Sequence, residues 1–307
     1  MSGDRTPVVY IAGSGHTGST LLALLLDSHP EIACTGETAI KPKIRRRGRE
    51  SAHRCSCGAL VTECPFWTEV FTLVARRGHN FDSSQWTNDY RFEQPLAQRV
   101  LNRLCASSSG RSVVQWAAGH LPFYRERVAR IDKVNVAFIR AVLEVSGATV
   151  FADTSKRLPR LLHLSRVPAL DVRVVLLVRD VRGYAASAKR RGMPIFDAAR
   201  TWNRDQVAMA DIASRLPEDR VLRIRYEDIC AEPKATLSRL WRFCGVSDMN
   251  PPEVVDAARH HVLGNSMRMA GQIRIRLDQS WRERLDNHET ERILEIAGEA
   301  NRKLGYV

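Results

Sequence analysis

The sequence contains no uninterrupted apolar run of the length that a membrane-spanning helix needs, although 44% of its 307 residues are hydrophobic. A bilayer crossing takes about 20 mostly apolar residues, so we expect no transmembrane segment. Residues 1–7 also lack the charged region, the long apolar region and the cleavage site of a secretion signal. We therefore expect a cytoplasmic protein.

Lysine is scarce as well, because only seven of the 47 basic residues are Lys and the others are Arg. The formal net charge is nevertheless +13 and the pI is about 9.9, which favours an anionic ligand or surface. No basic helical stripe alternates with aromatic residues, so nucleic acid is not the expected partner. The chain also shows no internal repeat and no low-complexity segment.

Seven cysteines in an apparently cytoplasmic chain do not suggest a disulfide framework. Three of them form a local cluster at Cys55, Cys57 and Cys64. A C-x-C pair followed by a third Cys seven residues later is shorter than the usual zinc spacing. A metal site, a disulfide and simple local packing all remain open for this cluster, and we expect no metal among the catalytic or binding residues.

The segment 13–20, Gly-Ser-Gly-His-Thr-Gly-Ser-Thr, lies between an apolar run at 8–12 and another at 21–26. A buried strand, a glycine-rich turn and a helix in this order predict a phosphate site, because backbone N–H groups and the helix dipole favour a bound anion. The pattern lacks the lysine of nucleoside triphosphatases and has Ser19 there, which argues against ATP or GTP hydrolysis. It also fits G-x-G-x-x-G with Glu37 19 residues after Gly18, so a Rossmann-type NAD(P)-dependent oxidoreductase is an alternative.

Short apolar runs alternate with helical patterns along the whole chain, which predicts an α/β, P-loop-like three-layer fold with a mostly parallel central sheet. We expect strands at 8–12, 32–34, 149–152, 172–178 and 221–224, and helices at 19–27, 95–105, 159–164, 182–190, 198–215, 234–244 and 289–303. We treat 1–307 as one domain, in which a loop and helical insertion at about 41–145 shapes an acceptor site. Basic residues at about 263–285 suggest a lid loop.

A second candidate phosphate site follows the predicted strand 172–178. Arg179 emerges where α/β folds bind their ligands, and Ser187 lies about two turns into the next helix. A guanidinium and a hydroxyl can hold one phosphate together.

With these two sites the chain resembles sulfotransferases that use 3′-phosphoadenosine 5′-phosphosulfate (PAPS). That family has a glycine-rich 5′-phosphosulfate loop, matched by 15–20, and an Arg…Ser pair eight residues apart for the 3′-phosphate, matched by Arg179 and Ser187. The segment 225–229 resembles its Y-E-D motif, and 202–204 resembles a helix of the tyrosylprotein branch. Similar bacterial members also carry segments like 55–67 and 264–281.

The resemblance implies PAPS as co-substrate, PAP as product and a hydroxyl acceptor on a small metabolite, lipid, glycan or peptide. Glu37 resembles the catalytic Glu of tyrosylprotein sulfotransferases, while His16 and Lys156 would lie at the phosphosulfate, where His16 replaces the usual Lys or Arg. No metal is required. A PAP- or anion-binding protein without catalysis is the second alternative. The residues implied in donor binding are Ser14, Gly15, His16, Thr17, Gly18, Ser19, Thr20, Arg179, Ser187, Tyr226, Arg268 and Arg276.

Overall fold

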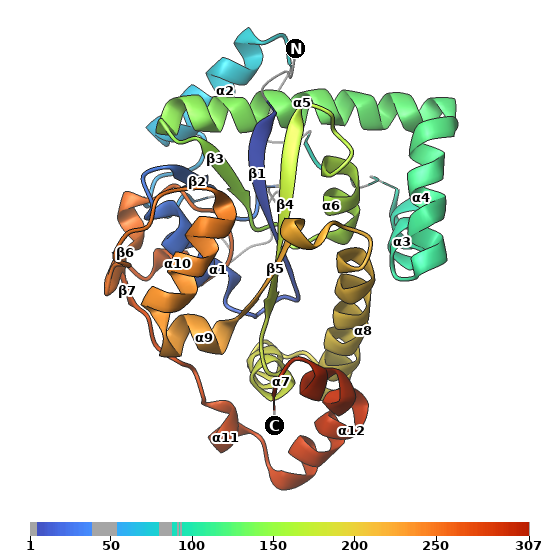
Figure 1. The fold of residues 1–307 in the computed structure, drawn as a ribbon, viewed down its shortest axis with the longest axis vertical. Helices are drawn as coiled ribbons and strands as arrows, with labels where there is room; N and C mark the ends of the chain where they lie inside the picture. Colours follow the sequence, from blue (N-terminus) through green and yellow to red (C-terminus); the bar gives the residue numbers. More distant parts are fainter. Residues whose placement is uncertain (1–4, 39–53, 80–87, 91, 93, 307) are drawn as a thin grey trace.

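A five-stranded parallel sheet forms the centre of the computed structural model, which describes residues 5–38, 54–79, 88–90, 92 and 94–306 (Figure 1). The strand order is β2-β3-β1-β4-β5. The α/β fold with a mostly parallel sheet is thus confirmed. The strands are β1 (Thr6–Gly13), β2 (Ile32–Cys34), β3 (Val150–Asp153), β4 (Leu170–Val178) and β5 (Val221–Arg225).

Both faces of the sheet are buried, because alternate residues of each strand pack on opposite layers of helices. On β1, Val8 and Tyr10 belong to one core and Val9 and Ile11 to the other. The second core includes α1 (Ser19–Asp27), α9 (Tyr226–Ala231) and α10 (Pro233–Cys244). The first includes α5 (Pro122–Ser146), α6 (Leu158–Leu164) and α8 (Ile195–Ala213), so the molecule has three layers.

In the described part of the chain between β2 and β3, four helices form the helical insertion. They are α2 (Pro65–Arg76), α3 (Pro95–Cys105), α4 (Ser108–His120) and α5. The sequence predicted α3 with the same bounds, but it predicted no helix at the position of α2. Pro65 begins α2 at a position where its missing N–H costs nothing, and Trp67 stacks on Phe138 of α5 with ring centroids 6.2 Å apart. The residues 41–53 of the predicted loop lie outside the described part of the chain.

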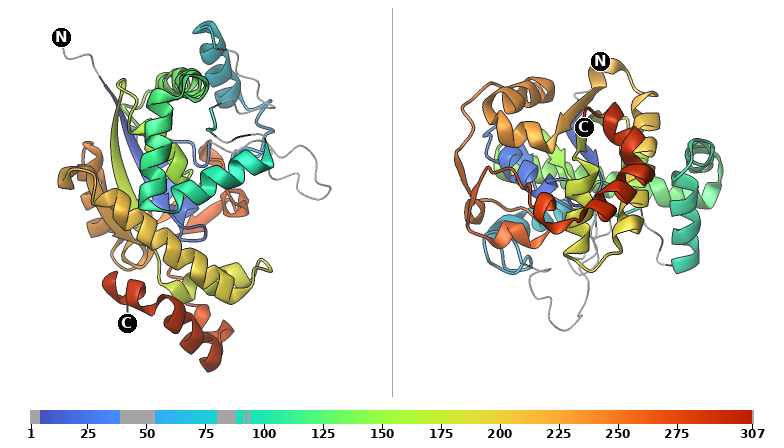
Figure 2. Two further views of the ribbon diagram at one scale, coloured as in Figure 1. Left: turned by 90° about the vertical axis from the view of Figure 1, so that its right-hand side faces the viewer. Right: turned by 90° about the horizontal axis from the view of Figure 1, so that it is seen from below.

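The C-terminal part covers the carboxyl end of the sheet. The helices α7 (Val181–Lys189) and α12 (Asn287–Lys303) pack against α8, as Figure 2 shows for α8 and α12. The segment 265–285, expected as an irregular loop, contains the 3-10 turn Ser266–Met269, β7 (Gln272–Arg274) and α11 (Trp281–Arg284). The strand β7 pairs antiparallel with β6 (Val254–Asp256). Two further 3-10 turns are Glu218–Arg220 and Ala257–Arg259.

Within the residues that the structure describes, no helix has both the length and the apolar character needed to cross a bilayer.

Candidate active site at the carboxyl edge of the sheet

The predicted site residues lie on segments that follow the carboxyl ends of all five strands. In Figure 1 the strands run from the end of the sheet near α5 toward the end near α7. The loop 13–20 follows β1, Glu37 follows β2, Lys156 follows β3, Arg179 follows β4 and Tyr226 follows β5. Parallel strands end at one edge of a sheet, so residues far apart in the sequence meet there.

The loop 13–20 has a backbone that only particular residues allow. Gly18 has φ 86°, and a Cβ there would lie 2.4 Å from Cδ2 of Tyr226, so no side chain fits without displacing that ring. His16 also has a positive φ of 64°, which is uncommon outside glycine. The Thr17 hydroxyl donates to the carbonyl of Ser14 at 2.9 Å. Gly18 supplies no side-chain cap to α1, which leaves the first turn of that helix open to an anion.

Lys156 connects the loop to Glu37. Its ammonium donates to Ser19 Oγ at 2.9 Å and forms an ion pair with Glu37 Oε1. Asp153 orders the turn before Lys156, because its Oδ1 accepts from Ser155 N at 2.8 Å while Oδ2 accepts from the buried Arg160 at 2.7 Å. One side chain therefore contacts both the candidate base and the loop 13–20.

The backbone of Glu37 is fixed by a distant segment. Glu37 N donates to the Leu263 carbonyl at 3.0 Å, and Leu263 N donates to the Thr35 carbonyl at 2.9 Å. Between them Gly36 has φ 77°, and a Cβ on it would lie 1.9 Å from the Leu263 carbonyl oxygen. Glycine is required at this close approach of two backbones.

The second candidate site centres on Arg179, of which only 6% is exposed. Its guanidinium donates to the His16 carbonyl at 3.1 Å and to the carbonyl and Oδ2 of Asp278 at 3.1 and 3.2 Å. It also lies 4.5 Å from the centre of the Tyr226 ring. Arg179 therefore joins the phosphate loop to the C-terminal segment.

Arg190 connects Ser187 to Asp278, the residue that also contacts Arg179. The Arg190 guanidinium donates to Ser187 Oγ at 3.3 Å and lies 3.6 Å from Asp278 Oδ2. Burial raises the pKa of Asp278, but hydrogen bonds from Ser280 and the charge of Arg179 outweigh it and lower that pKa to about 2. A carboxylate that is ionised at neutral pH thus lies among the groups predicted to bind a phosphate.

The surroundings of His16 favour its neutral form at neutral pH. Burial, followed by the positive charges of Arg191, Lys156 and Arg179, lowers the pKa of His16 to about 4. Glu37 acts in the opposite direction, but its effect is smaller. The imidazole ring lies 6.2 Å from the ring of Tyr184.

The remaining predicted donor residues take different positions. The hydroxyl of Tyr226 donates to the Arg276 carbonyl at 3.2 Å, and the Arg276 residue is exposed. Arg268 is only 2% exposed, and its guanidinium donates to the carbonyls of Gly264, Asn265 and Arg54. The roles of Arg268 and Arg276 in donor binding stay predictions.

A sequence model of the sulfotransferase family matches residues 7–251. The chain belongs to the sulfotransferase family. It is 28% identical over 81 residues to protein-tyrosine sulfotransferase 2 of Gallus gallus, and this match spans 24% of the chain and only 22% of that protein.

Two solved sulfotransferase structures share the fold. The sulfotransferase domain from the curacin biosynthetic pathway is 18% identical with a TM-score of 0.52, and each chain is covered over 99% of its length. The sulfotransferase domain of the Synechococcus PCC 7002 olefin synthase is 16% identical with a TM-score of 0.50, covering 99% of this chain and 96% of the other. At these identities the likeness concerns the fold alone.

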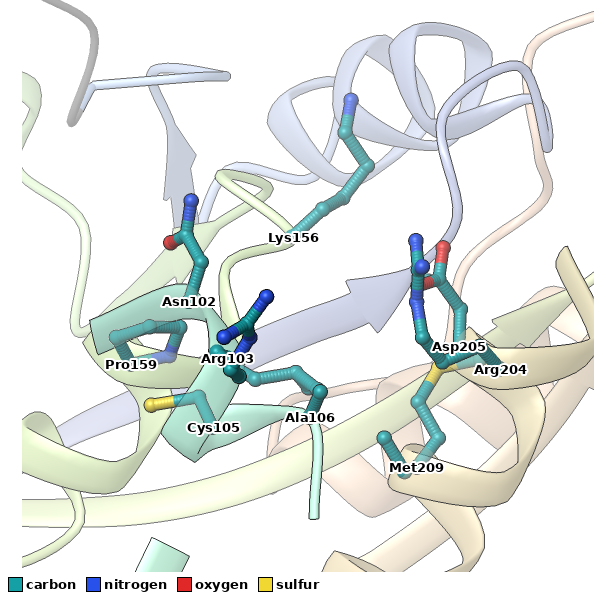
Figure 3. A pocket seen from close by; sticks show the side chains of 12 residues that line it. Asn102, Arg103, Cys105, Ala106, Lys156, Pro159, Arg204, Asp205 and Met209 are labelled. Carbon is teal, nitrogen blue, oxygen red and sulfur yellow. The ribbon is translucent and has the colours of Figure 1, made fainter. Parts of the chain in front are cut away.

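A cavity of about 510 Å³ opens beside the phosphate loop of this sulfotransferase-family chain. In Figure 3 the α8 residues Arg204 and Asp205 and the α3 residues Asn102 and Arg103 surround it, and Lys156 extends from its margin. Burial raises the pKa of Asp205, although the nearby Ser14 and the positive charge of Arg204 oppose the rise. The cavity thus combines cationic, acidic and neutral polar groups next to the candidate base.

Sequence reasoning missed several residues of this edge. Arg190 lies one helical turn after Ser187, a spacing that was available in the sequence. Asp278 contacts Arg179 because the C-terminal segment passes the carboxyl end of β4, and no local sequence pattern predicts this contact. The cavity residues of α3 and α8 come together through tertiary packing, so no spacing in the sequence predicts that they share a cavity.

Proposed function

We propose that this protein transfers a sulfuryl group from PAPS to a hydroxyl acceptor. The observation that carries the proposal is that the Lys156 ammonium touches both Glu37 and Ser19. A cation in this position is able to serve the donor phosphosulfate on the loop 13–20 while it keeps a carboxylate beside the reaction centre.

The two candidate anion sites support a donor that carries phosphates on the 3′ and 5′ positions of its ribose. The loop 13–20 and the first turn of α1 would hold the 5′-phosphosulfate. Arg179 and Ser187, with Arg190 beside them, would hold the 3′-phosphate, and Arg179 would yield or share its contact with Asp278. Tyr226, Arg268 and Arg276 complete the donor residues that we propose.

In the proposed reaction Glu37 accepts the proton of the acceptor hydroxyl as that oxygen forms a bond to sulfur. The bond between sulfur and the bridging oxygen of the 5′-phosphate breaks, and the negative charge remains on PAP. Lys156 and His16, together with the N–H groups of the loop, stabilise that charge. A bound polyanion raises the pKa of His16 from its low value of about 4 in this structure.

The acceptor would enter through the cavity in Figure 3, which lies beside Lys156. Its lining combines charged and polar side chains with apolar ones such as Leu158 and Met209, which fits a hydroxyl compound with both polar and apolar parts, whether a metabolite, lipid, glycan or peptide. We propose a single domain over 1–307, in which 41–145 frames this side and 263–285 covers the donor. A cytoplasmic location remains our prediction from the sequence.

The oxidoreductase alternative fits the sheet poorly. In the Rossmann order the strand that carries the ribose-binding acid lies next to β1. Here β3 separates β2 from β1, and Glu37 is paired with Lys156.

A ligand series tests the proposal against both alternatives. Thermal unfolding should shift upward with PAP and much less with NAD, NADP, ATP or adenosine 5′-phosphate, which lacks the 3′-phosphate. Acceptor pools incubated with sulfur-labelled PAPS should then yield labelled products. A larger shift with NAD or NADP would favour the oxidoreductase, and PAP binding without any labelled product would favour a non-catalytic binding protein.

A further inference from the structure

Three cysteines and one histidine that the proposed reaction does not use meet in one place. Cys55, Cys57 and Cys64 come from the segment before α2, and His261 comes from the segment after β6. Their three Sγ atoms and one histidine ring nitrogen all lie within 4.8 Å of one another. We refer to these four residues as the Cys₃His cluster.

Three distances between the ligand atoms are close to the edges of a tetrahedron around one metal ion. Sγ of Cys57 and Sγ of Cys64 are 3.7 Å apart, while His261 Nδ1 lies 3.5 Å from Sγ of Cys55 and 3.4 Å from Sγ of Cys64. Zinc bonds of about 2.3 Å to sulfur and 2.0–2.1 Å to nitrogen give tetrahedral edges of about 3.8 Å between two sulfurs and about 3.5–3.6 Å between sulfur and nitrogen. We propose that the Cys₃His cluster binds one Zn²⁺ ion.

The local chain is built to present these ligands. Gly58 has φ 91° and donates to the Cys55 carbonyl at 2.9 Å, and Cys55 N donates to the Ala59 carbonyl at 2.9 Å. This tight turn directs Cys55 and Cys57 toward one point. Cys64 is the N-cap residue of α2, where the positive end of the helix dipole favours a thiolate. Phe66 stacks on the His261 ring with centroids 4.4 Å apart and the planes 1° from parallel.

The surrounding charge also fits. Zn²⁺ with three thiolates and a neutral imidazole carries a net charge of −1, which a buried cation nearby would stabilise. The buried guanidinium of Arg268 donates to the carbonyl of Arg54, the residue before Cys55, at 2.9 Å. The cluster offers four protein ligands, so the coordination is closed and the role is structural rather than catalytic.

The metal would connect the segment 54–64 to the backbone that holds the candidate base. Ser56 Oγ donates to the His260 carbonyl at 2.6 Å and accepts from Val262 N at 3.0 Å, on either side of His261. The next residue, Leu263, pairs with the backbone of Glu37. Zinc bound at His261 would therefore hold the segment that pairs with the backbone next to Glu37.

The same thiols allow a competing state, a disulfide between Cys57 and Cys64. That state would leave Cys55 and His261 without a function in common. Metal content and thiol content together separate the two states, since zinc needs all three thiols reduced.

The test uses the full chain without an affinity tag, dialysed against metal-free buffer. We expect about one zinc per chain by elemental mass spectrometry. Replacement of zinc by cobalt should give the visible bands of tetrahedral Co²⁺ and a thiolate-to-cobalt charge-transfer band in the near ultraviolet. Cys57→Ser and His261→Gln should each weaken zinc binding by more than about 100-fold, because loss of a residue that only supports a metal ligand already costs up to about 100-fold. Competition with a chromogenic chelator measures the zinc affinity.

Cys230→Ser is the matched control, because Cys230 is also a half-buried free thiol but lies outside the cluster; it should retain about one zinc. Wild-type protein that binds neither zinc nor cobalt, or that contains a Cys57–Cys64 disulfide as purified, would overturn the proposal. Full zinc affinity in both Cys57→Ser and His261→Gln would overturn it as well. Should a variant fail to fold, the wild-type metal content and cobalt spectrum decide the question without it, and neither depends on sulfuryl transfer.

Discussion

Replacing Glu37 with Gln removes the proposed general base while the hydrogen bonds that hold the site are kept. The amide oxygen of the replacement still accepts a hydrogen bond from Lys156, and the backbone hydrogen bonds that join Thr35 and Glu37 to Leu263 do not involve the side chain. The variant loses only the ability to take a proton from the acceptor. We therefore expect a large fall in turnover with little change in fold or donor affinity.

The loss of a general base costs about 10²–10⁴ in rate, which is about 2.7–5.4 kcal/mol of activation free energy at about 1.36 kcal/mol per tenfold. The affinity for PAP should change by less than about threefold, or ~0.7 kcal/mol. Single-turnover transfer from labelled PAPS to an acceptor found in the pool screen gives the rate, and calorimetry with PAP gives the affinity.

Glu31→Gln is the matched control, since Glu31 precedes β2 at its other end and accepts hydrogen bonds from Ser247. It should transfer sulfate at the wild-type rate. Wild-type turnover in Glu37→Gln would refute the assignment of Glu37 as the base. A fall in turnover matched by an equal loss of PAP affinity would instead make Glu37 a structural partner of Lys156.

Three further outcomes follow from the same site. Arg179→Ala should weaken PAP binding by about 10–100-fold, because a charge-assisted hydrogen bond contributes about 1.5–3 kcal/mol. Ser187→Ala should weaken PAP binding less. Unchanged PAP affinity of Arg179→Ala on titration would rule out the 3′-phosphate assignment. At a pH between about 4 and the higher pKa that His16 has in the complex, PAP binding should be coupled to the uptake of a proton by His16. The contribution of His16 to PAP affinity therefore falls as the pH rises. Calorimetry in buffers of different ionisation enthalpy measures the proton uptake, which should be smaller in His16→Gln. Equal uptake in both proteins would remove His16 from the donor site. Asp278→Asn should tighten PAP binding several-fold, because the carboxylate that now contacts Arg179 would repel the 3′-phosphate; weaker binding would mean that Asp278 positions Arg179 instead.

Local sequence patterns predicted those helices and strands whose boundaries are marked by neighbouring residues. The α1 helix was predicted with the observed bounds, because its glycine-rich start and apolar run are contiguous. The β6–β7 pair was missed, since each strand has three residues and is stabilised only by a partner 16 or more residues away. The α2 helix was hidden by the arginine- and cysteine-rich segment that precedes it.

The candidate site divides in the same way. Glu37, Lys156 and Arg179 follow strands, and the rule that ligands bind at the carboxyl edge of a parallel sheet locates such residues from sequence. His261 lies 197 residues after Cys64, so nothing in the C-x-C spacing reveals the fourth ligand of the Cys₃His cluster. Contacts of this kind are set by the path of the whole chain.

The most direct test of sulfuryl transfer is the ratio of products formed from PAPS. We predict that wild-type protein, incubated with PAPS and an acceptor pool, forms PAP and sulfated acceptor in equal amounts, as in-line transfer requires. Mass spectrometry of both products in one reaction measures that ratio. Sulfated product without PAP, PAP formation without any sulfated product, or no consumption of PAPS in any pool would contradict the account.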